Sequence, residues 1–206
     1  TSMEFQVNEH VLIPRQDTET LVELVLSEHK EKNISLLDVC TGSGCIAISL
    51  AKLGGYTDVT ALDLSEEALK VARSNGEKLL DQPVKFIKSD MFSALNPEKQ
   101  YNVIVSNPPY IPSQVIEGLE PEVKDHEPRM ALDGEPDGLK FYRILAEEGK
   151  KYLKNGGSIY MEIGWDQAKD VTEIFEAMGF SGLRTVRDMA GNDRVVCAGR
   201  RSKNYV

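Results

Sequence analysis

The stretch DVCTGSGCIAISLA, residues 38–51, decides the fold class of this chain. The apolar run ISLLDV, residues 34–39, predicts a buried strand, and a helix is expected from about Cys45 to Leu53, where Gly54 and Gly55 end it. The glycine turn TGSG joins the two. A strand that passes through a glycine turn directly into a helix is typical of α/β sheets that bind a ligand at the turn.

Strands and helices continue to alternate along the chain. Further strands are predicted at 59–64, 84–88, 102–106 and 158–163, and further helices at 18–30, 66–80, 139–153 and 166–178. Asp17 or Thr18 is the expected N-cap of the first helix, Ser65 that of the third, and Asn155-Gly156-Gly157 the turn before the strand at 158. The runs 183–189 and 194–200 flank AGND and predict an antiparallel hairpin. We therefore expect a Rossmann-like α/β fold, with a mostly parallel seven-stranded sheet, one antiparallel edge strand, and helices on both faces.

Composition narrows the class of protein. The chain has 206 residues, enough for one domain, with 41% hydrophobic and 28% charged residues. The net charge of -9 argues against broad contact with nucleic-acid phosphates. Three cysteines without a C-x-x-C pair and three scattered histidines suggest neither a disulfide framework nor a metal site. With no membrane-spanning run and no signal peptide, we expect a cytoplasmic protein without a membrane partner.

The glycine turn predicts a cofactor site. Gly42 and Gly44 let a ligand approach bare backbone at a helix N-terminus, and Asp63 ends the next strand, where an acid can accept both hydroxyls of a ribose. The letters GSGCIA also satisfy the dinucleotide pattern, so NAD is an alternative cofactor. Asp38 favours S-adenosylmethionine (SAM) instead, because its carboxylate repels a pyrophosphate and attracts an ammonium and a sulfonium. Asp90 is placed to bond the adenine amino group.

The stretch SNPPYIP, residues 106–112, predicts the acceptor site. Asn107 follows the strand at 102–106, on the edge where doubly wound sheets bind ligands. Its side-chain carbonyl and the main-chain carbonyl of Pro108 can accept both N–H donors of a planar amide or aromatic amine. Pro108 and Pro109 stiffen the turn, and Tyr110 offers a flat face. Catalysis would then rest on positioning, without a strong base. The alternative is a proline-stiffened surface loop.

With these motifs the chain resembles the PrmC (HemK) family of protein-glutamine N-methyltransferases, which modify the Gly-Gly-Gln glutamine of peptide chain release factors. The resemblance rests on VLIPRQDTETLVE, DVCTGSGCIAISLA, ALDLSEEAL, SDMF, SNPPYIP, EPRMALDGEPDGL, EIGWDQ and RDMAGNDRVV, in the family's order. It implies a SAM-dependent methyltransferase fold, with S-adenosylhomocysteine (SAH) as the product. Residues expected to line the cofactor are Asp38, Cys40, Thr41, Gly42, Ser43, Gly44, Asp63, Leu64, Asp90, Met91, Phe92 and Asn107. Asn107, Pro108, Pro109 and Tyr110 would hold the glutamine and form the catalytic turn, and Arg15 and Glu19 would border the site.

The sequence departs from the family pattern at two positions of the cofactor wall. Cys40 stands where many relatives have glycine, and Met91 where an aromatic residue can occur. Residues 1–17 resemble a linker from an upstream helical domain, and 18–206 the catalytic domain. The release factor is the expected partner, and a monomer is expected. The stretch 111–137 is predicted to be an irregular functional loop.

The sequence leaves other functions open. The acceptor could be a ribosomal-protein glutamine, or an adenine or cytosine amino group of nucleic acid, which would need base extrusion. The net charge of -9 makes a nucleic-acid substrate less favoured than a ribosomal-protein glutamine. From a different class, the chain could be a non-catalytic binding module on a methyltransferase fold.

Overall fold

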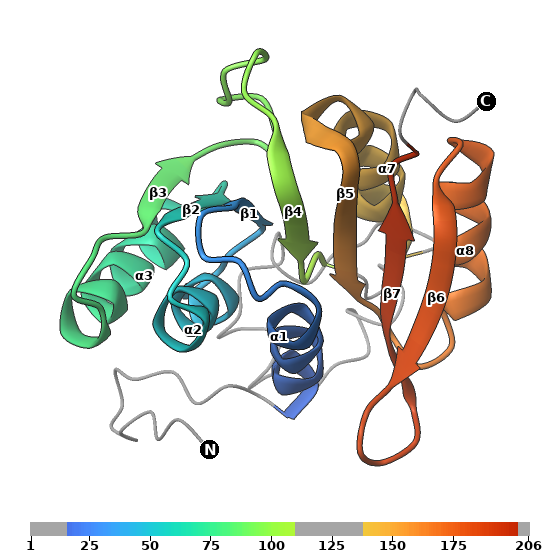
Figure 1. The fold of residues 1–206 in the computed structure, drawn as a ribbon, viewed down its shortest axis with the longest axis horizontal. Coiled ribbons are helices and arrows are strands. Elements are labelled where there is room, and N and C mark those ends of the chain that lie inside the picture. The colour runs from blue at the N-terminus through green and yellow to red at the C-terminus, as the bar shows by residue number, and fades with distance from the viewer. Residues whose placement is uncertain (1–15, 110–137, 202–206) are drawn as a thin grey trace.

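The computed structural model describes residues 16–109 and 138–201. Helices and strands alternate through most of the chain, as the sequence predicts (Figure 1). The helices are α1 (Gln16–Glu28), α2 (Cys45–Gly54), α3 (Glu66–Leu79), α7 (Lys140–Tyr152) and α8 (Ala168–Ala177). The strands are β1 (Ser35–Val39), β2 (Asp58–Asp63), β3 (Lys85–Lys88), β4 (Tyr101–Ser106), β5 (Leu153–Glu162), β6 (Ser181–Arg187) and β7 (Asp193–Gly199).

All seven strands form one sheet in the order β3-β2-β1-β4-β5-β7-β6. The pairs from β3 through β5 are parallel, whereas β7 is antiparallel to both β5 and β6. The mostly parallel seven-stranded sheet and the terminal hairpin are thus confirmed. The sequence predicted the antiparallel strand at the edge of the sheet. In the structure the antiparallel strand is β7, which lies next to the edge strand β6. The chain inserts β7 between β5 and β6, so β6 becomes the edge strand.

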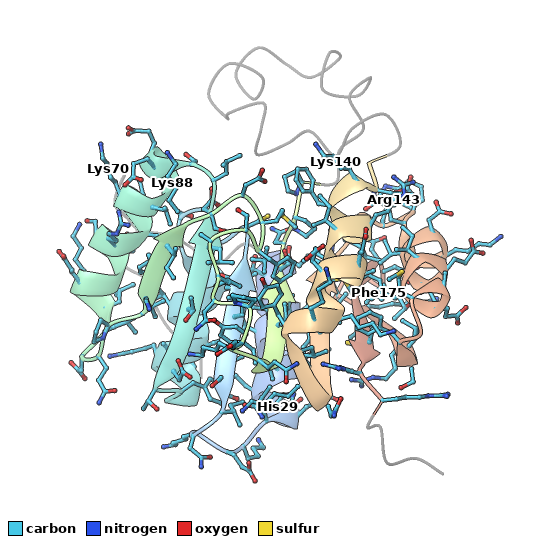
Figure 2. The ribbon with its side chains drawn as sticks, turned by 90° about the horizontal axis from the view of Figure 1, so that it is seen from above. His29, Lys70, Lys88, Lys140, Arg143 and Phe175 are labelled. Carbon is cyan, nitrogen blue, oxygen red and sulfur yellow. The ribbon has the colours of Figure 1, made fainter. Side chains whose placement is uncertain are left out.

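Helices cover both faces of the sheet. Figure 1 shows α1, α2 and α3 in front of the strands and α7 and α8 behind them. One cluster of buried side chains joins α1 and α2 to the sheet, and a second joins the opposite face to α7 and α8. Phe175 of α8 is fully buried in the second cluster, and Figure 2 shows it pointing into the interior beside α7. A sheet covered on both faces explains the continuous apolar runs of the central strands.

Local signals placed most elements to within a few residues, but the predicted N-cap of α1 and the predicted turn at 155–157 are wrong. The Ser65 hydroxyl accepts a hydrogen bond from the Ala68 N–H at 3.1 Å, which confirms Ser65 as the N-cap of α3. Helix α1 begins at Gln16, so neither Asp17 nor Thr18 is its N-cap.

The predicted turn at residues 155–157 lies inside β5 instead. Tyr101 pairs with Leu153 and Val103 with Ser158, so the extra residues of β5 bulge out of the ladder. A bulge keeps the strand continuous while absorbing the residues that a turn would have used.

The C-terminal end of α1 is hydrogen-bonded to strands β5 and β6. Glu28 accepts hydrogen bonds from the Tyr160 hydroxyl of β5 and from Arg184 of β6, both at 2.7 Å. The ring nitrogen Nε2 of His29 lies 2.9 Å from the same Tyr160 hydroxyl. These contacts fix α1 against the strands. None of the helices within residues 16–109 and 138–201 is long and apolar enough to cross a membrane.

Candidate functional site

The predicted cofactor and acceptor motifs meet at the carboxyl ends of β1 and β4. These strands are parallel neighbours, with Asp38 opposite Val105 and Val39 opposite Ser106. From β1 the chain runs outward to β2 and β3, whereas from β4 it continues to β5 on the other side. The strand order therefore reverses between β1 and β4, and a reversal of this kind opens a crevice for ligands in α/β sheets.

Ser106 fastens the two strand ends together. Its side chain is completely buried, and its hydroxyl donates a hydrogen bond of 2.6 Å to the main-chain oxygen of Val39. Val39 directly precedes the glycine turn, and Ser106 directly precedes Asn107. The bond therefore sets the position of Asn107 relative to the glycine turn.

Gly42 and Gly44 have different roles in the turn. Both have positive φ, 58° and 87°, which glycine adopts without strain. A Cβ on Gly42 would meet nothing within 4 Å, so this glycine borders open space. A Cβ on Gly44 would lie 3.1 Å from the Ala72 Cβ and from the Ile48 Cδ1. Gly42 thus leaves room for a ligand, and Gly44 lets α2 approach α3.

The Asp63 carboxylate is held in place by two main-chain donors. Oδ2 accepts a 2.8 Å bond from the Gly42 N–H, and Oδ1 accepts a 2.8 Å bond from the Ser65 N–H. Each carboxylate oxygen can accept a second hydrogen bond, so Asp63 keeps acceptor capacity at the edge of the turn. Leu64 follows it with 40% of its surface exposed. The remaining acceptor capacity of the Asp63 carboxylate is what a ribose with two hydroxyl donors would need.

Asp38 lies beneath the turn, with only 1% of its surface exposed. Its Oδ2 accepts a 2.7 Å hydrogen bond from the Thr41 hydroxyl. Its Oδ1 has no partner of ordinary hydrogen-bond geometry among the described residues, although the Ala47 N–H is near enough to favour the charged form. Burial raises the pKa of Asp38 to about 7; the Thr41 hydroxyl opposes that rise, and the neighbouring Asp63 and Glu162 add to it.

Cys40 and Met91 occupy strained positions that face each other. Their φ angles are 63° and 50°, a region that non-glycine residues rarely adopt. The Cys40 Sγ lies 3.6 Å from the Met91 Sδ. Glycine adopts a positive φ of this kind without strain, so position 40 has a backbone conformation that would suit glycine. In this chain a cysteine carries the strain and places its sulfur beside that of Met91.

The segment after β3 turns its side chains in different directions. Ser89 organises the turn, because its hydroxyl donates to the Met91 carbonyl at 2.7 Å and accepts from the Ala94 N–H at 3.0 Å. Asp90 is exposed at this turn. Phe92 is buried and stacks on Tyr152 of α7, with ring centroids 5.2 Å apart. The Phe92 ring therefore belongs to the core, and Met91 is the apolar side chain that lies beside the glycine turn.

The acceptor turn is described as far as residue 109. Asn107 is exposed, Pro108 is buried and Pro109 is partly buried. A buried proline directly after an exposed asparagine fixes the backbone while leaving the amide side chain accessible. Tyr110, Arg15 and the predicted loop at 111–137 lie outside the described residues, and Glu19 is exposed on α1.

Several residues of the site escaped the sequence analysis. Ser106 binds the last residue of β1, and Ser89 binds the main chain of Met91 and Ala94 in the turn after β3. Each is the first residue of a quoted motif, SNPPYIP or SDMF, and the motif alone predicted no role for it. Glu162, at the end of β5, has 3% of its surface exposed. Gln167 accepts a 2.8 Å bond from the Gly164 N–H and donates to the Gly138 carbonyl at 3.4 Å. Glu162 and Gln167 belong to the stretch EIGWDQ, which contributes to the family resemblance but predicts no role for either residue.

Comparison with known proteins agrees with this geometry. The family described as methyltransferase small domain matches residues 16–118. A release factor glutamine methyltransferase from Thermodesulfovibrio yellowstonii is 42% identical over 198 residues, which cover 95% of this chain and 71% of that protein. One from Streptococcus pneumoniae is 44% identical over 195 residues, covering 94% of this chain and 69% of that protein. The chain belongs to the release factor glutamine methyltransferase family.

The curated relatives that this chain matches are longer than the chain itself. The chain spans 55% of the Fusobacterium nucleatum relative, at 44% identity over 199 residues that cover 94% of the chain. Among solved structures, a release factor-specific protein-(glutamine-N5) methyltransferase from Alicyclobacillus acidocaldarius is 31% identical, with a TM-score of 0.58, over 96% of this chain and 100% of that chain. A methyltransferase from Pyrococcus furiosus has a TM-score of 0.68 at 20% identity, over 96% of this chain and 89% of that chain, which shows the shared fold alone.

Proposed function

We propose that this chain transfers a methyl group from SAM to the side-chain amide nitrogen of a glutamine, and that its substrate is the Gly-Gly-Gln glutamine of a peptide chain release factor. The family supplies the class of reaction, because its named members are release factor glutamine methyltransferases. One observation in the structure carries the proposal: the exposed Asn107 amide is fixed beside the glycine turn by the bond from Ser106 to Val39.

The residues around the turn fit SAM. Asp38 offers a buried carboxylate oxygen without a partner of ordinary geometry among the described residues, and an ammonium or a sulfonium would satisfy it. Asp63 is held so that it can accept ribose hydroxyls, Gly42 leaves room for the ligand, and the Met91 sulfur offers an apolar contact. A dinucleotide fits less well, since its pyrophosphate would meet the Asp38 carboxylate. When bound, SAM supplies a methyl group on a positively charged sulfur.

The acceptor turn would hold a planar amide still. The Asn107 side-chain carbonyl can accept one N–H of the glutamine amide, and the Pro108 carbonyl can accept the other. With both donors satisfied, the amide plane is fixed and its nitrogen can be aimed at the methyl group. One of the two N–H protons passes to solvent as the N–CH₃ bond forms. Effective alignment of two reactants is worth about 7–11 kcal/mol of barrier in favourable intramolecular cases. Positioning by a rigid turn is therefore a sufficient catalytic role for Asn107.

The experiment is transfer of labelled methyl from SAM, offered in parallel to a release factor, to ribosomal protein and to unmethylated nucleic acid. Wild-type protein should label the Gly-Gly-Gln glutamine. Asn107→Ala should lose at least about a hundredfold in rate, as when one transition-state hydrogen-bonding group is removed from an enzyme. Asn33→Ala is the matched control, because Asn33 is an exposed asparagine before β1, at the opposite edge of the sheet.

The outcomes separate the alternatives. Label on ribosomal protein or nucleic acid alone would keep the acceptor turn and overturn the release-factor substrate. SAM binding without transfer to any acceptor would favour a non-catalytic binding module. Full activity in Asn107→Ala would refute the role given to the turn.

We propose a cytoplasmic monomer, and light scattering after gel filtration tests the oligomeric state. We also propose that residues 18–206 are the catalytic domain, although α1 already begins at Gln16, and that the additional length of the relatives contributes to docking the release factor. Adding that segment from a relative should then lower KM for the release factor and leave SAM affinity unchanged.

A further inference from the structure

Two buried carboxyl groups lie on the same face of the sheet at its carboxyl edge. Asp38, near the end of β1, has 1% of its surface exposed, and Glu162, the last residue of β5, has 3%. Alternate residues of a strand share a face, so Asp38 lies on the side of Leu36 and Glu162 on the side of Tyr160. Leu36 and Tyr160 both belong to the buried cluster under α1 and α2. Asp38 and Glu162 therefore point into the same layer of the protein.

In the part of the chain that the structure describes, the groups that act on the charge of Asp38 are acidic or neutral. Asp63 of the neighbouring strand β2 and Glu162 of β5, which lies beyond β4, both disfavour its negative charge. Helix α2 contributes the Cys45 thiol, whose own ionisation is opposed by burial and by the charges of Glu162, Asp38 and Glu19 of α1. Among residues 16–109 and 138–201, the Thr41 hydroxyl and the Ala47 N–H favour the ionised carboxylate.

Such an environment favours the neutral form of a carboxyl group. Burial without a charged partner penalises a carboxylate, and two nearby carboxylates add to the penalty. We propose that Asp38 carries a proton before the cofactor binds and releases it when the positively charged end of SAM enters, with Glu162 as a positioning residue that keeps Asp38 protonated until then. This inference rests on SAM as the cofactor and adds a coupling between cofactor binding and protonation.

The proton and charge balance are simple. The O–H bond of the Asp38 carboxyl breaks, the proton goes to solvent, and no other bond changes. The remaining carboxylate offsets positive charge brought in by the ligand. SAM brings a sulfonium and an α-ammonium, whereas SAH brings the α-ammonium alone. An opposite charge within about 4–6 Å favours the ionised carboxyl, which is why entry of the cation can expel the proton.

Calorimetric titration measures this proton directly. SAM and SAH are titrated into the protein at pH 6.5 in buffers of different ionisation enthalpy, and the slope of the observed enthalpy gives the protons released. We expect about three-quarters of a proton per SAM at pH 6.5, from a carboxyl that titrates near pH 7. SAM should also bind about fivefold more tightly at pH 7 than at pH 6, where only the ionised fraction is competent. The α-amino group of SAM stays mostly protonated over this range.

Glu162→Gln tests the role of the neighbour. The substitution keeps the shape of the side chain and removes its charge, so Asp38 should ionise at lower pH and the protons released at pH 6.5 should fall. Glu173→Gln is the matched control, because Glu173 is an exposed glutamate on α8 and should leave the release unchanged. An equal proton release in Glu162→Gln and wild type would overturn the role of Glu162.

A second measurement does not depend on ligand. Carbon-13 NMR of the side-chain carboxyls should show one aspartate titrating near neutral pH, with its resonance absent in Asp38→Asn. A midpoint near 4 would overturn the proposal. SAM binding with the same enthalpy in every buffer would also overturn it, while leaving the proposed function intact. Failure to bind SAM or SAH at all would refute the proposed cofactor and, with it, release of the proton on binding.

Discussion

Replacing Asp38 by asparagine should stabilise the protein as the pH rises. In the folded protein burial raises the pKa of Asp38 from its ordinary value of 3.8 to about 7. Below pH 3.8 both the folded and the unfolded chains hold the proton, and Asp38 contributes no pH dependence. Between pH 3.8 and 7 the unfolded chain ionises first, so each unit of pH favours unfolding by about 1.4 kcal/mol. Above pH 7 both states are ionised and the penalty is constant, at about 4 kcal/mol in total.

Asparagine cannot ionise, so Asp38→Asn removes this pH-dependent penalty. It adds a smaller penalty that does not depend on pH. Its carbonyl can still accept the hydrogen bond from the Thr41 hydroxyl, while its NH₂ would stand where Asp38 Oδ1 now lacks a partner of ordinary geometry among the described residues. A buried unsatisfied donor costs about 1–3 kcal/mol, and this cost does not depend on pH. The pH-dependent part of the stability difference between the two proteins therefore reports the ionisation of Asp38. From pH 5.5 to pH 8, the stability of Asp38→Asn should gain about 2 kcal/mol relative to wild type.

Urea unfolding of both proteins at pH 5.5, 6.5, 7.5 and 8 checks this prediction. All these values lie above the pI of about 5.0, where a protein without net charge tends to precipitate. The same variant should bind SAM more weakly, because a neutral amide cannot offset the cationic end. A stability difference that stays constant over the whole range would refute the reasoning, since it would mean that Asp38 is already ionised in the folded protein.

The strained Cys40, at φ 63°, predicts that Cys40→Gly is more stable than Cys40→Ala by about 1 kcal/mol in urea unfolding, since both lose the sulfur but only glycine relieves the backbone. Equal stability would show that the positive φ is not strained. Ser65→Ala should lower the free energy of unfolding by about 1 kcal/mol through loss of the α3 cap, whereas Ser65→Asp, which can still cap, should lower it less. Tyr160→Phe removes the hydroxyl between Glu28 and His29 and should cost about 1 kcal/mol in thermal or chemical unfolding; no loss would mean that the contacts at the end of α1 contribute nothing net.

Much of the fold could be predicted because its signals are local. The apolar run before the glycine turn predicts β1, the turn itself predicts the start of α2, and Ser65 marks the start of α3. Where the predicted end of an element was wrong, the observed end depends on pairing with residues far away in the chain. The glycines at 156 and 157 read as a turn in isolation, but pairing with β4 draws the same residues into β5 as a bulge.

In the candidate site, too, the positions of residues could be predicted from the sequence, whereas the directions of their side chains could not. Asp38 and Asp63 lie close to the carboxyl ends of predicted strands and Asn107 directly follows one, so parallel pairing alone brings them to one edge of the sheet. The direction of a side chain after a strand is not local information. Asp90 is exposed and Phe92 is buried against Tyr152, although the two are almost adjacent in the chain.

The sequence by itself therefore determined which segments are strands and helices, that the sheet is mostly parallel, and which residues gather at its carboxyl edge, since period, turn residues and chain order carry that information. Only the tertiary structure decided the insertion of β7 between β5 and β6, the bond from Ser106 to Val39, and the burial of Asp38 in the same layer as Glu162. These features depend on contacts between residues far apart in the chain. Burial in particular comes from helices and strands packing together, and it moves the pKa of a carboxyl group that no neighbour in the sequence marks as unusual.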